Sequence, residues 1–332
     1  MTRSRSQDII EGLFHPKSIA VVGASSNESL QTDGWVARLV DFGYPGKIYP
    51  INPKAAEIMG LKAYPTIVDV PEPVDLVIFN VPFKICGKIM ADCAEKGVKY
   101  AHVYTAGFSE TAREEGVRLQ NEIQHTARQA GMRIIGPNCM GLYYPRGGLT
   151  FGRPFSKTPG TVAFVSQSGA SAVRVVVLGN ERGLNFSKVV SYGNAIDLDG
   201  TDFVEYLATD PETEVITCYV EGVKDGRRYA DVIRECTQKK PIITLKAGIT
   251  EGGSRAAASH TAVLAGSEVI WNAFFKQSGV IRVDDLEELL DAAMAFLYLR
   301  RPKGRRIGIV GRGGGLGVVA TDMCEKAGLR VP

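Results

Sequence analysis

The sequence predicts an α/β protein with parallel sheets, and three observations support this. Short β-branched runs alternate with longer amphipathic stretches along most of the 332 residues, which is the pattern of βαβ units. Hydrophobic residues make up 45% and charged residues 23%, as in ordinary globular proteins, so a wholly disordered chain is excluded. The 37 glycines predict tight loops in which the backbone closely approaches a ligand or another segment.

Residues 1–150 are predicted to form a Rossmann-like, doubly wound domain. The expected strands are short β-branched runs at residues 18–22, 47–51, 76–80, 100–105 and 133–135. The expected helices between them lie at residues 35–42, 85–96 and 112–130. Parallel strands that are joined in this way have right-handed crossovers. The last of these strands ends at Gly136-Pro137-Asn138.

The same alternation restarts over residues 158–300, which are predicted to form a second, flavodoxin-like domain. Its expected strands lie at residues 161–165, 188–191, 215–220 and 242–245. Its expected helices lie at residues 170–182, 203–208, 228–239, 268–277 and 285–299. A further strand at 305–310, a glycine loop and a helix at 318–326 follow. Because one βα unit cannot form a sheet alone, residues 303–332 are expected to begin a third, incomplete domain.

Composition and charge argue against several classes of function. Lys and Arg number 39 against 36 Asp and Glu, without a long basic run, so nucleic-acid binding has no electrostatic footprint. The longest apolar runs are far shorter than the ~20 residues of a membrane span, and the N-terminus lacks the apolar region of a secretory signal. The six cysteines have neither CxxC nor zinc spacing. We therefore expect a cytoplasmic protein with reduced thiols and no metal site of its own.

The first glycine loop follows the strand at residues 18–22 and reads Gly23-Ala24-Ser25-Ser26-Asn27. At this position of an α/β sheet, backbone N–H groups can face a phosphate. The spacing is not G-x-G-x-x-G, and the second strand ends without the acidic residue that binds a ribose in NAD sites. Lys47 or Lys54 would suit an extra phosphate, as in NADP or in the 3′-phosphate of coenzyme A. A turn that only packs explains this loop equally well.

A second loop, Ser166-Gln167-Ser168-Gly169, lies between a predicted strand and a predicted helix. A helix N-terminus carries roughly half a positive charge, which favours a phosphate. The serine-nucleophile motif G-x-S-x-G requires glycine where Ser166 stands. We therefore interpret this segment as an anion-binding loop.

One histidine, His260, lies in a run of small residues at 252–266. Imidazole is a good nucleophile towards phosphoryl groups at neutral pH. Glu221, at the end of the strand at 215–220, is the best-placed carboxylate to orient such a ring, although a solvated acid at a strand end is the simpler interpretation. The remaining histidines are interpreted as surface or hydrogen-bonded core residues: His15, His102 and His125.

Four segments in a fixed order carry a family resemblance. They are IYPINP at 48–53, GPNCMG at 136–141, SQSG at 166–169 and SHTAVLAG at 259–266. Together they resemble the α-type part of the nucleoside-diphosphate-forming acyl-CoA synthetase superfamily, which is related to the succinyl-CoA synthetase α subunit. The resemblance implies a coenzyme A-binding first domain, followed by succinyl-CoA-ligase-type domains.

The resemblance assigns coenzyme A to nine residues of the first domain. They are Gly23, Ser25, Asn27, Lys47, Asn80, Pro82, Thr105, Ala106 and Asn138. The first three would face the diphosphate, and Lys47 would hold a phosphate or the adenine end. The next two would line the nucleotide or pantetheine path, and the last three would border the thiol and acyl centre.

The resemblance also implies the chemistry. Acyl-CoA, phosphate and ADP (or GDP) would be interconverted with a small carboxylic acid, CoA and ATP (or GTP) through an acyl phosphate. His260 would be phosphorylated, Glu221 would hold its other ring nitrogen, and Ser168 and Gly169 would receive the phosphate. The sequence contains no visible ATP-grasp region, so a β-type ATP-grasp subunit or a fused domain would supply nucleotide and Mg²⁺, within an oligomer.

The sequence is also compatible with two other functions. One is a non-catalytic coenzyme A-binding or regulatory module, against which the intact segment around His260 counts. The other is an NADP-dependent oxidoreductase, against which the absence of G-x-G-x-x-G counts. The acyl group is not encoded in a one-dimensional pattern, because pocket shape decides it. The choice of ADP or GDP belongs to the ATP-grasp part, which this sequence does not show.

Overall fold

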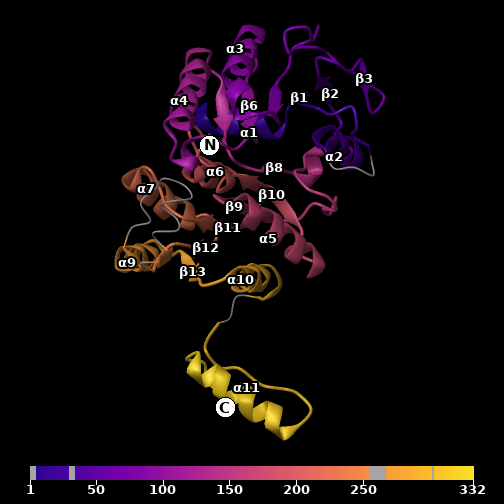
Figure 1. Ribbon diagram of the computed structural model, residues 1–332. Coiled ribbons are helices and arrows are strands. Elements are labelled where there is room, and N and C mark those ends of the chain that lie inside the picture. Colours follow the sequence, from indigo (N-terminus) through magenta and orange to yellow (C-terminus); the bar gives the residue numbers. More distant parts are fainter. Residues whose placement is uncertain (1–4, 30–33, 251, 254–266, 301–302) are drawn as a thin grey trace. The chain divides into compact units, whose positions relative to one another are not determined.

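The structure is a computed structural model that describes residues 5–29, 34–250, 252–253, 267–300 and 303–332. The chain divides into two compact units, Met1–Leu297 and Tyr298–Pro332. The first unit contains a five-stranded and a six-stranded sheet with helices packed on them (Figure 1). Among the described residues, no helix has the length and apolar character needed to span a bilayer.

The first sheet has the strand order β2-β1-β5-β6-β7, and all its neighbours are parallel. Its strands are β1 (Ser18–Val22), β2 (Lys47–Ile51), β5 (Leu76–Phe79), β6 (Tyr100–Val103) and β7 (Arg133–Ile135). Its helices are α1 (Arg5–Phe14), α2 (Trp35–Phe42), α3 (Cys86–Lys96) and α4 (Glu114–Gln129). A small hairpin comprises β3 (Glu57–Ile58) and β4 (Leu61–Lys62). All five expected strands are confirmed, and their order along the sheet, 2-1-3-4-5, is a doubly wound one.

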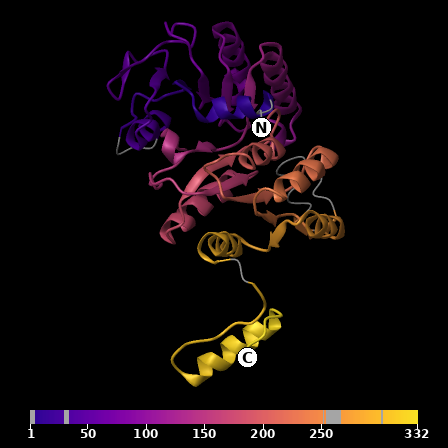
Figure 2. The same ribbon diagram turned by 180° about the vertical axis from the view of Figure 1, so that it is seen from behind.

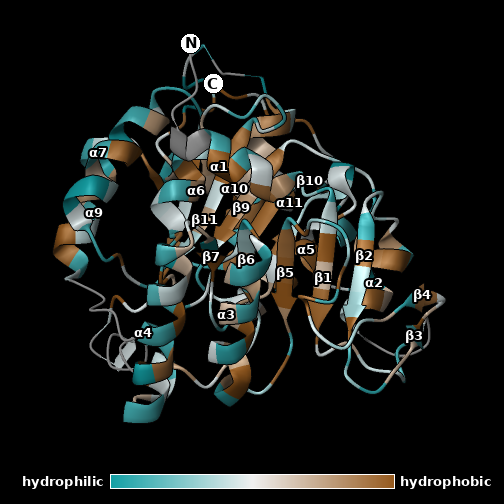
Figure 3. Ribbon diagram, turned by 90° about the horizontal axis from the view of Figure 1, so that it is seen from above, coloured by the Kyte–Doolittle hydropathy of each residue, from teal (hydrophilic) through white to brown (hydrophobic). Residues whose placement is uncertain are grey.

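The central strand β1 is buried on both faces, as expected of a parallel strand. Ala20 and Val22 belong to the apolar cluster that includes α3 and α4, whereas Ile19 and Val21 belong to the cluster that includes α1 and α2. Figure 3 shows strands β1 and β5 in the brown of hydrophobic residues, whereas helices α3 and α4 also carry hydrophilic residues in teal. Because successive strand residues point to opposite faces, β1 anchors helices on both sides of the sheet.

The second sheet has the strand order β13-β12-β11-β9-β10-β8. Its strands are β8 (Gly141–Tyr143), β9 (Val162–Ser166), β10 (Phe186–Ser191), β11 (Val215–Val220), β12 (Ile242–Lys246) and β13 (Ile281–Val283). Its helices are α5 (Gly169–Glu181), α6 (Gly200–Leu207), α7 (Gly226–Thr237), α9 (Glu268–Ser278) and α10 (Leu286–Tyr298). Counted in chain order, the five parallel strands repeat the order 2-1-3-4-5.

The sequence did not predict β8, which lies ahead of residue 150 but belongs to the second sheet. It pairs antiparallel with β10, with Leu142 opposite Val190. Arg133 in β7 donates two hydrogen bonds to Asp197 of the second half, at 2.8 and 3.0 Å. These contacts, together with one continuous apolar cluster, hold the two sheets in a single unit.

A buried lysine lies in the part of the core that the two halves share. Lys188 in β10 is 1% exposed, and its ammonium donates to Asp210 at 2.8 Å and to Glu212 at 2.7 Å. The ammonium also lies 4.6 Å from the ring centre of Tyr144. A charge buried this deeply is tolerated because it is paired with carboxylates and faces an aromatic ring.

The second unit, Tyr298–Pro332, contains α11 (Gly314–Lys326), shown with its preceding extended segment in Figure 2. The expected strand at 305–310 was wrong: within the described part of this unit, only an isolated bridge joins Arg306 to Arg330. A strand needs a paired neighbour along its length, and a single βα unit does not supply one. The expected helix at 318–326 is confirmed, but it begins four residues earlier, at Gly314.

Candidate functional site

In each sheet, the strand order reverses beside one central strand, between β1 and β5 and between β9 and β11. Ligands of doubly wound folds bind at this point, outside the carboxyl ends of the strands. Gly23 follows β1 with a φ of +87°, and a Cβ there would lie 2.1 Å from the carbonyl oxygen of Asn80. Asn80 in turn donates its N–H to Val22 at 2.9 Å. The structure therefore brings the predicted residues Gly23 and Asn80 together, and only glycine allows this approach.

Two more predicted residues, Thr105 and Asn138, meet at the same edge of the first sheet. The Thr105 hydroxyl donates to the carbonyl oxygen of Val81 at 2.7 Å, and Asn138 N–H donates to the carbonyl of Thr105 at 3.0 Å. Asn138 has a φ of +59°, which asparagine tolerates better than most residues. Ala106 lies beside them and is exposed, as is Pro82 at the end of the β5 loop.

A cavity of about 340 Å³ opens at the carboxyl ends of β1 and β2. Its walls are mostly apolar, with few polar groups, and include Gly23, Ile51, Ile67, Val81, Ile85 and Lys88. A cavity with mostly apolar walls suits a flat, largely apolar ring system.

The amide of Ser25 has a partner that the sequence analysis missed. Ser25 N–H donates to Oε1 of Glu28 at 3.0 Å, and Oε2 of Glu28 accepts from Val36 N–H at 2.9 Å and Ala37 N–H at 3.1 Å. The carboxylate thus occupies the positive end of α2. Asn27 N–H donates to the Ser25 hydroxyl oxygen at 3.2 Å. Within this loop, the chain's own carboxylate therefore holds an amide that we expected to face a diphosphate.

Lys47 does not lie with the other predicted residues. The parallel register pairs Lys47 with Ser18 and Ile51 with Val22, so Lys47 lies at the amino edge of the sheet, opposite Gly23. Its ammonium forms an ion pair with Glu72, which lowers the pKa of that carboxyl. The register thus places Lys47 at the edge of the sheet away from the glycine loop, which does not favour its assignment to a phosphate or the adenine end of coenzyme A. Lys54 follows β2 at the carboxyl edge.

A second cavity, of about 350 Å³, joins the two halves of the first unit. Four predicted residues line it: Ala106 and Asn138 from the first half, and Ser168 and Gly169 from the second. Polar side chains that the sequence did not indicate as site residues also line it: Tyr104, Gln167 and Asn194. The structure therefore gathers the proposed acyl and phosphate residues, which are far apart in the sequence, around one cavity.

The N-terminus of α5 forms one wall of this shared cavity. Ser168 is the N-cap residue, and its hydroxyl accepts from Ser171 N–H at 3.2 Å. Gly169 and Ala170 begin the helix, and their N–H groups have no partner among the described residues. A Cβ on Gly169 would lie 2.9 Å from Cγ of Met140. These two N–H groups and the positive helix end form an arrangement suited to an anion.

Glu221, directly after β11, is connected to the shared cavity through Gln167. Oε1 of Gln167 accepts the N–H groups of Glu221 at 2.9 Å and Gly222 at 3.2 Å. The Tyr219 hydroxyl donates to the Glu221 carboxylate at 3.2 Å, and burial, together with that carboxylate, raises the pKa of Tyr219 to about 12. The Lys246 ammonium donates to the Glu221 carbonyl at 2.8 Å. Burial lowers the pKa of Lys246 to about 8, although the charge of Glu221 opposes this shift. The loop that carries Glu221 is therefore held at several points.

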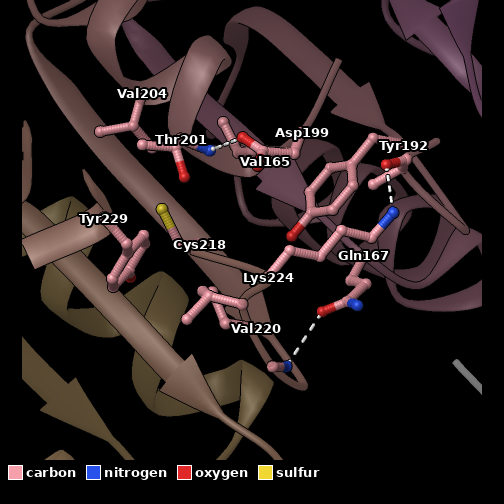
Figure 4. Close-up of a pocket in the computed structure, with 14 residues that line it drawn as sticks. Val165, Gln167, Tyr192, Asp199, Thr201, Val204, Cys218, Val220, Lys224 and Tyr229 are labelled. Atoms are coloured by element: carbon pink, nitrogen blue, oxygen red, sulfur yellow. Dashed lines mark hydrogen bonds between the residues drawn. The ribbon is translucent and has the colours of Figure 1, made fainter. Parts of the chain in front are cut away.

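On the other side of Gln167, a small cavity of about 20 Å³ is lined mostly by apolar side chains, with a few polar groups among them (Figure 4). There, Asp199 accepts from Thr201 N–H at 2.8 Å, and Lys224 donates to the Ala195 carbonyl at 2.6 Å. Figure 4 also shows the hydrogen bond from the backbone to Gln167. A space of this size holds about one water molecule, so it is not a substrate site.

His260 and the motif at 259–266 lie outside the described residues. His102 is buried and faces the carbonyl of Cys139 at 3.3 Å, and burial lowers its pKa to about 4. It is thus a neutral core residue, as the sequence indicated. Within the described part of the chain, no three His, Cys, Asp or Glu side chains form a group that could hold a metal ion.

Comparison with known proteins identifies families for both halves. A CoA binding domain matches residues 17–145, and a succinyl-CoA ligase like flavodoxin domain matches residues 159–296. The alpha subunit of acetate–CoA ligase [ADP-forming] I from Pyrococcus furiosus is 42% identical over 328 residues, which cover 97% of this chain and 71% of that one. The 4-hydroxybutyrate–CoA ligase [ADP-forming] of Nitrosopumilus maritimus is 36% identical, over 96% of this chain and 46% of that one.

A solved structure gives the same result. It is acetyl-coenzyme A synthetase 1 from Ca. Korarchaeum cryptofilum in complex with phosphate and ADP, with a TM-score of 0.88 and 41% identity over 97% of this chain and 69% of that one. The chain therefore spans about 70% of the alpha subunit and less than half of the longer relative. On this similarity in sequence, domains and fold, the chain belongs to the NDP-forming acyl-CoA synthetase family of acid–thiol ligases, as an α-type component.

Proposed function

We propose that this chain interconverts acyl-CoA, phosphate and ADP or GDP with a small carboxylic acid, CoA and ATP or GTP, together with a nucleotide-binding partner. One observation carries the proposal: the coenzyme A-type half and the positive end of α5 line the same cavity of about 350 Å³. A thioester and a phosphate can react only where both are held in contact. Residues 1–150 would bind CoA, residues 158–300 would handle the phosphoryl group, and residues 303–332 would begin a further domain.

Coenzyme A would lie along the carboxyl edge of the first sheet. The apolar cavity beside Gly23 suits its adenine, and the loops that carry Asn80 and Pro82 would line the path to the shared cavity. The thiol end would reach Ala106 and Asn138. Because Glu28 occupies the start of α2, we assign the CoA phosphates to the outer part of the glycine loop, with Lys54 or Lys88 in place of Lys47 as the cation.

The reaction would begin at the acyl carbonyl. A phosphate oxygen attacks the thioester carbon, the C–S bond breaks, and CoA leaves as a thiolate, which gives an acyl phosphate. The N–H groups of Gly169 and Ala170 would stabilise the phosphate charge as it redistributes. Fixed donors of this kind lower a barrier because they need no reorganisation.

The phosphoryl group would then pass to the chain itself. A ring nitrogen of His260 attacks phosphorus, the P–O bond breaks, and the carboxylate leaves. Glu221 would accept the N–H of the other ring nitrogen and so hold the ring in one tautomer. The phosphoryl group would finally pass from His260 to ADP or GDP.

The nucleotide would bind to a partner. The Pyrococcus relative is named as an alpha subunit, which supports a second subunit, and the longer Nitrosopumilus relative is compatible with a fused domain. We assign the ATP-grasp function and Mg²⁺ to that partner. The complex would be an oligomer that works in the cytoplasm.

Labelling tests the proposal. The chain is combined with its ATP-grasp partner, Mg²⁺ and ATP that carries a radioactive γ-phosphate. We expect acid-labile, base-stable label on this chain, lost in His260→Ala and retained in the control His125→Ala, whose side chain is exposed. CoA binding by a wild-type chain that never becomes labelled would contradict the enzyme and favour a binding module.

A further inference from the structure

Asn194, in the loop after β10, is a buried polar residue of the shared cavity that the proposed chemistry does not use. It is 7% exposed, and its N–H donates to the carbonyl of Pro137 at 3.0 Å. The preceding Gly193 has a φ of +54°, and a Cβ there would lie 2.3 Å from the carbonyl oxygens of Pro137 and Asn138. The backbone of the two loops is therefore in direct contact, which fixes where the Asn194 side chain begins.

The surroundings of Asn194 decide which way its carboxamide faces. Its Nδ2 lies 2.6 Å from Oε2 of Glu110, 3.1 Å from Oε1 of Gln120 and 3.4 Å from the Ser109 hydroxyl. An ionised carboxylate can only accept hydrogen bonds. The NH₂ end of Asn194 must therefore face Glu110, and its carbonyl end must face the opposite way.

This orientation is passed on to Asn138. Oδ1 of Asn194 lies 3.5 Å from Nδ2 of Asn138, a long contact in which a donor faces an acceptor. If the Asn138 carboxamide were reversed, two carbonyl oxygens would face each other. One N–H of Asn138 is thus directed to Asn194, and the other N–H and the carbonyl oxygen keep a fixed orientation at the acyl end of the cavity.

Glu110 also holds the adjacent loop of the cavity. Its second oxygen, Oε1, accepts from Gly107 N–H at 2.5 Å and from Phe108 N–H at 3.1 Å. These amides follow directly after Ala106, which lines the cavity. The Glu110 carboxylate therefore fixes the loop beside Ala106. Through Asn194, it also fixes which way the Asn138 carboxamide faces.

We infer that Glu110 is a positioning residue for the acyl centre: it orients the carboxamide of Asn138 through Asn194, so that an Asn138 N–H donates to an oxygen of the bound carboxylate or acyl phosphate. The inference rests on the proposed function and concerns its acid half-reaction. It does not involve the phosphoryl transfer between ATP and His260. The side chain of Glu110 acts only through other residues.

The test uses the full chain in complex with its ATP-grasp partner, with acetate as the probe acid. Glu110→Gln keeps the shape but adds a donor, so Asn194 and Asn138 can reverse. We expect the KM for acetate to rise about tenfold, which is what the loss of one good hydrogen bond to a charged group produces. The KM for CoA, the labelling of the chain by ATP and the melting temperature should remain close to the wild-type values.

Two further variants separate positioning from a general structural effect. Glu115→Gln is the matched control, because that side chain is half exposed and pairs with the exposed Lys84 at 3.7 Å; it should leave the KM for acetate unchanged. In an Asn194→Ala background, Glu110→Gln should lose most of its effect, because the connection is already broken.

An unchanged KM for acetate in Glu110→Gln overturns the inference, and so does a parallel loss of acetate affinity, CoA affinity and melting temperature. Fully additive effects of the two substitutions contradict the route through Asn194. A wild-type complex that is not labelled by ATP contradicts the proposed function itself. The two failures are therefore distinguishable.

Discussion

Oε1 of Gln167 accepts the backbone N–H of Glu221 at 2.9 Å and so joins the loop after β9 to the loop after β11. These are the two loops at the point where the strand order of the second sheet reverses. Gln167 also lines the shared cavity, so the same side chain links the proposed phosphate site to the residue proposed to orient His260. Its position explains how segments 54 residues apart can act at one site.

Replacement of Gln167 by Leu should destabilise the protein. The substitution leaves the N–H groups of Glu221 and Gly222 without their acceptor, and each unsatisfied buried donor costs about 1–3 kcal/mol. We expect the free energy of unfolding, measured with urea, to fall by about 2 kcal/mol or more. The control Gln129→Leu, at an exposed position of α4, should change it by less than about 0.5 kcal/mol. Equal effects of the two substitutions would contradict this role of Gln167.

Gly23→Ala should weaken coenzyme A binding. The new Cβ would lie 2.1 Å from the Asn80 carbonyl oxygen, so the two loops must separate. Gly43→Ala is a matched control, since Gly43 has a φ of +88° against +87° at Gly23, but a Cβ added at Gly43 would meet no atom within 4 Å. Both variants carry similar backbone strain. Calorimetry with CoA should show a Kd at least tenfold higher for Gly23→Ala than for the wild type, and an unchanged Kd for Gly43→Ala. Equal Kd values for the two variants would show that the close approach of Gly23 to Asn80 is not needed for coenzyme A binding.

Lys188→Met should strongly destabilise the first unit. It leaves Asp210 and Glu212 without the buried ammonium they share, and removal of one partner of a buried ion pair costs about 3–5 kcal/mol. Lys239→Met, which removes an exposed pair with Glu235 on one helix turn, should cost less than about 1 kcal/mol. Urea unfolding of both variants measures the difference. A loss in Lys188→Met as small as in the control would show that the buried pair contributes little.

Lys246 should make stability depend on alkaline pH. Burial lowers its pKa from 10.5 to about 8 in the folded chain. Between these values the unfolded chain binds more protons than the folded chain, so this group makes stability rise with pH. Below pH 8 both states are protonated, and its contribution is constant. The urea midpoint of the wild type, relative to that of Lys246→Met, should therefore be higher at pH 9.5 than at pH 7.5; an unchanged difference would contradict the lowered pKa.

Most strands were predictable because a buried parallel strand is a continuous apolar run with glycine or proline at its ends, as in β1 and β11. Three-residue strands such as β8 and β13 have no period of their own and exist because a neighbour pairs with them. Residues 305–310 show the opposite case: among the described residues of its unit, this apolar run has no neighbouring strand and does not form one. Whether a segment forms a strand thus depends both on its own residue pattern and on a neighbouring strand with which it can pair.

The site was predictable where a motif follows a strand, because the carboxyl ends of parallel strands meet. Asn138 and Gly169 are 31 positions apart in the sequence and line the same cavity. The edge of the sheet at which Lys47 lies could not be predicted, because it depends on the register of β1 and β2. Glu28 and Glu110 were missed because each contacts backbone N–H groups through a loop conformation that no sequence pattern specifies.

The central claim is that a thioester and a phosphate react at the shared cavity and phosphorylate this chain. The most direct measurement combines the complex with acetyl-CoA and radioactive inorganic phosphate, without any nucleotide. The account predicts label on the chain, one free thiol released for each labelled chain, and loss of the label in His260→Ala, in which the acyl phosphate can still form. Thiol release without label on the wild-type chain, or label that persists in His260→Ala, would contradict it.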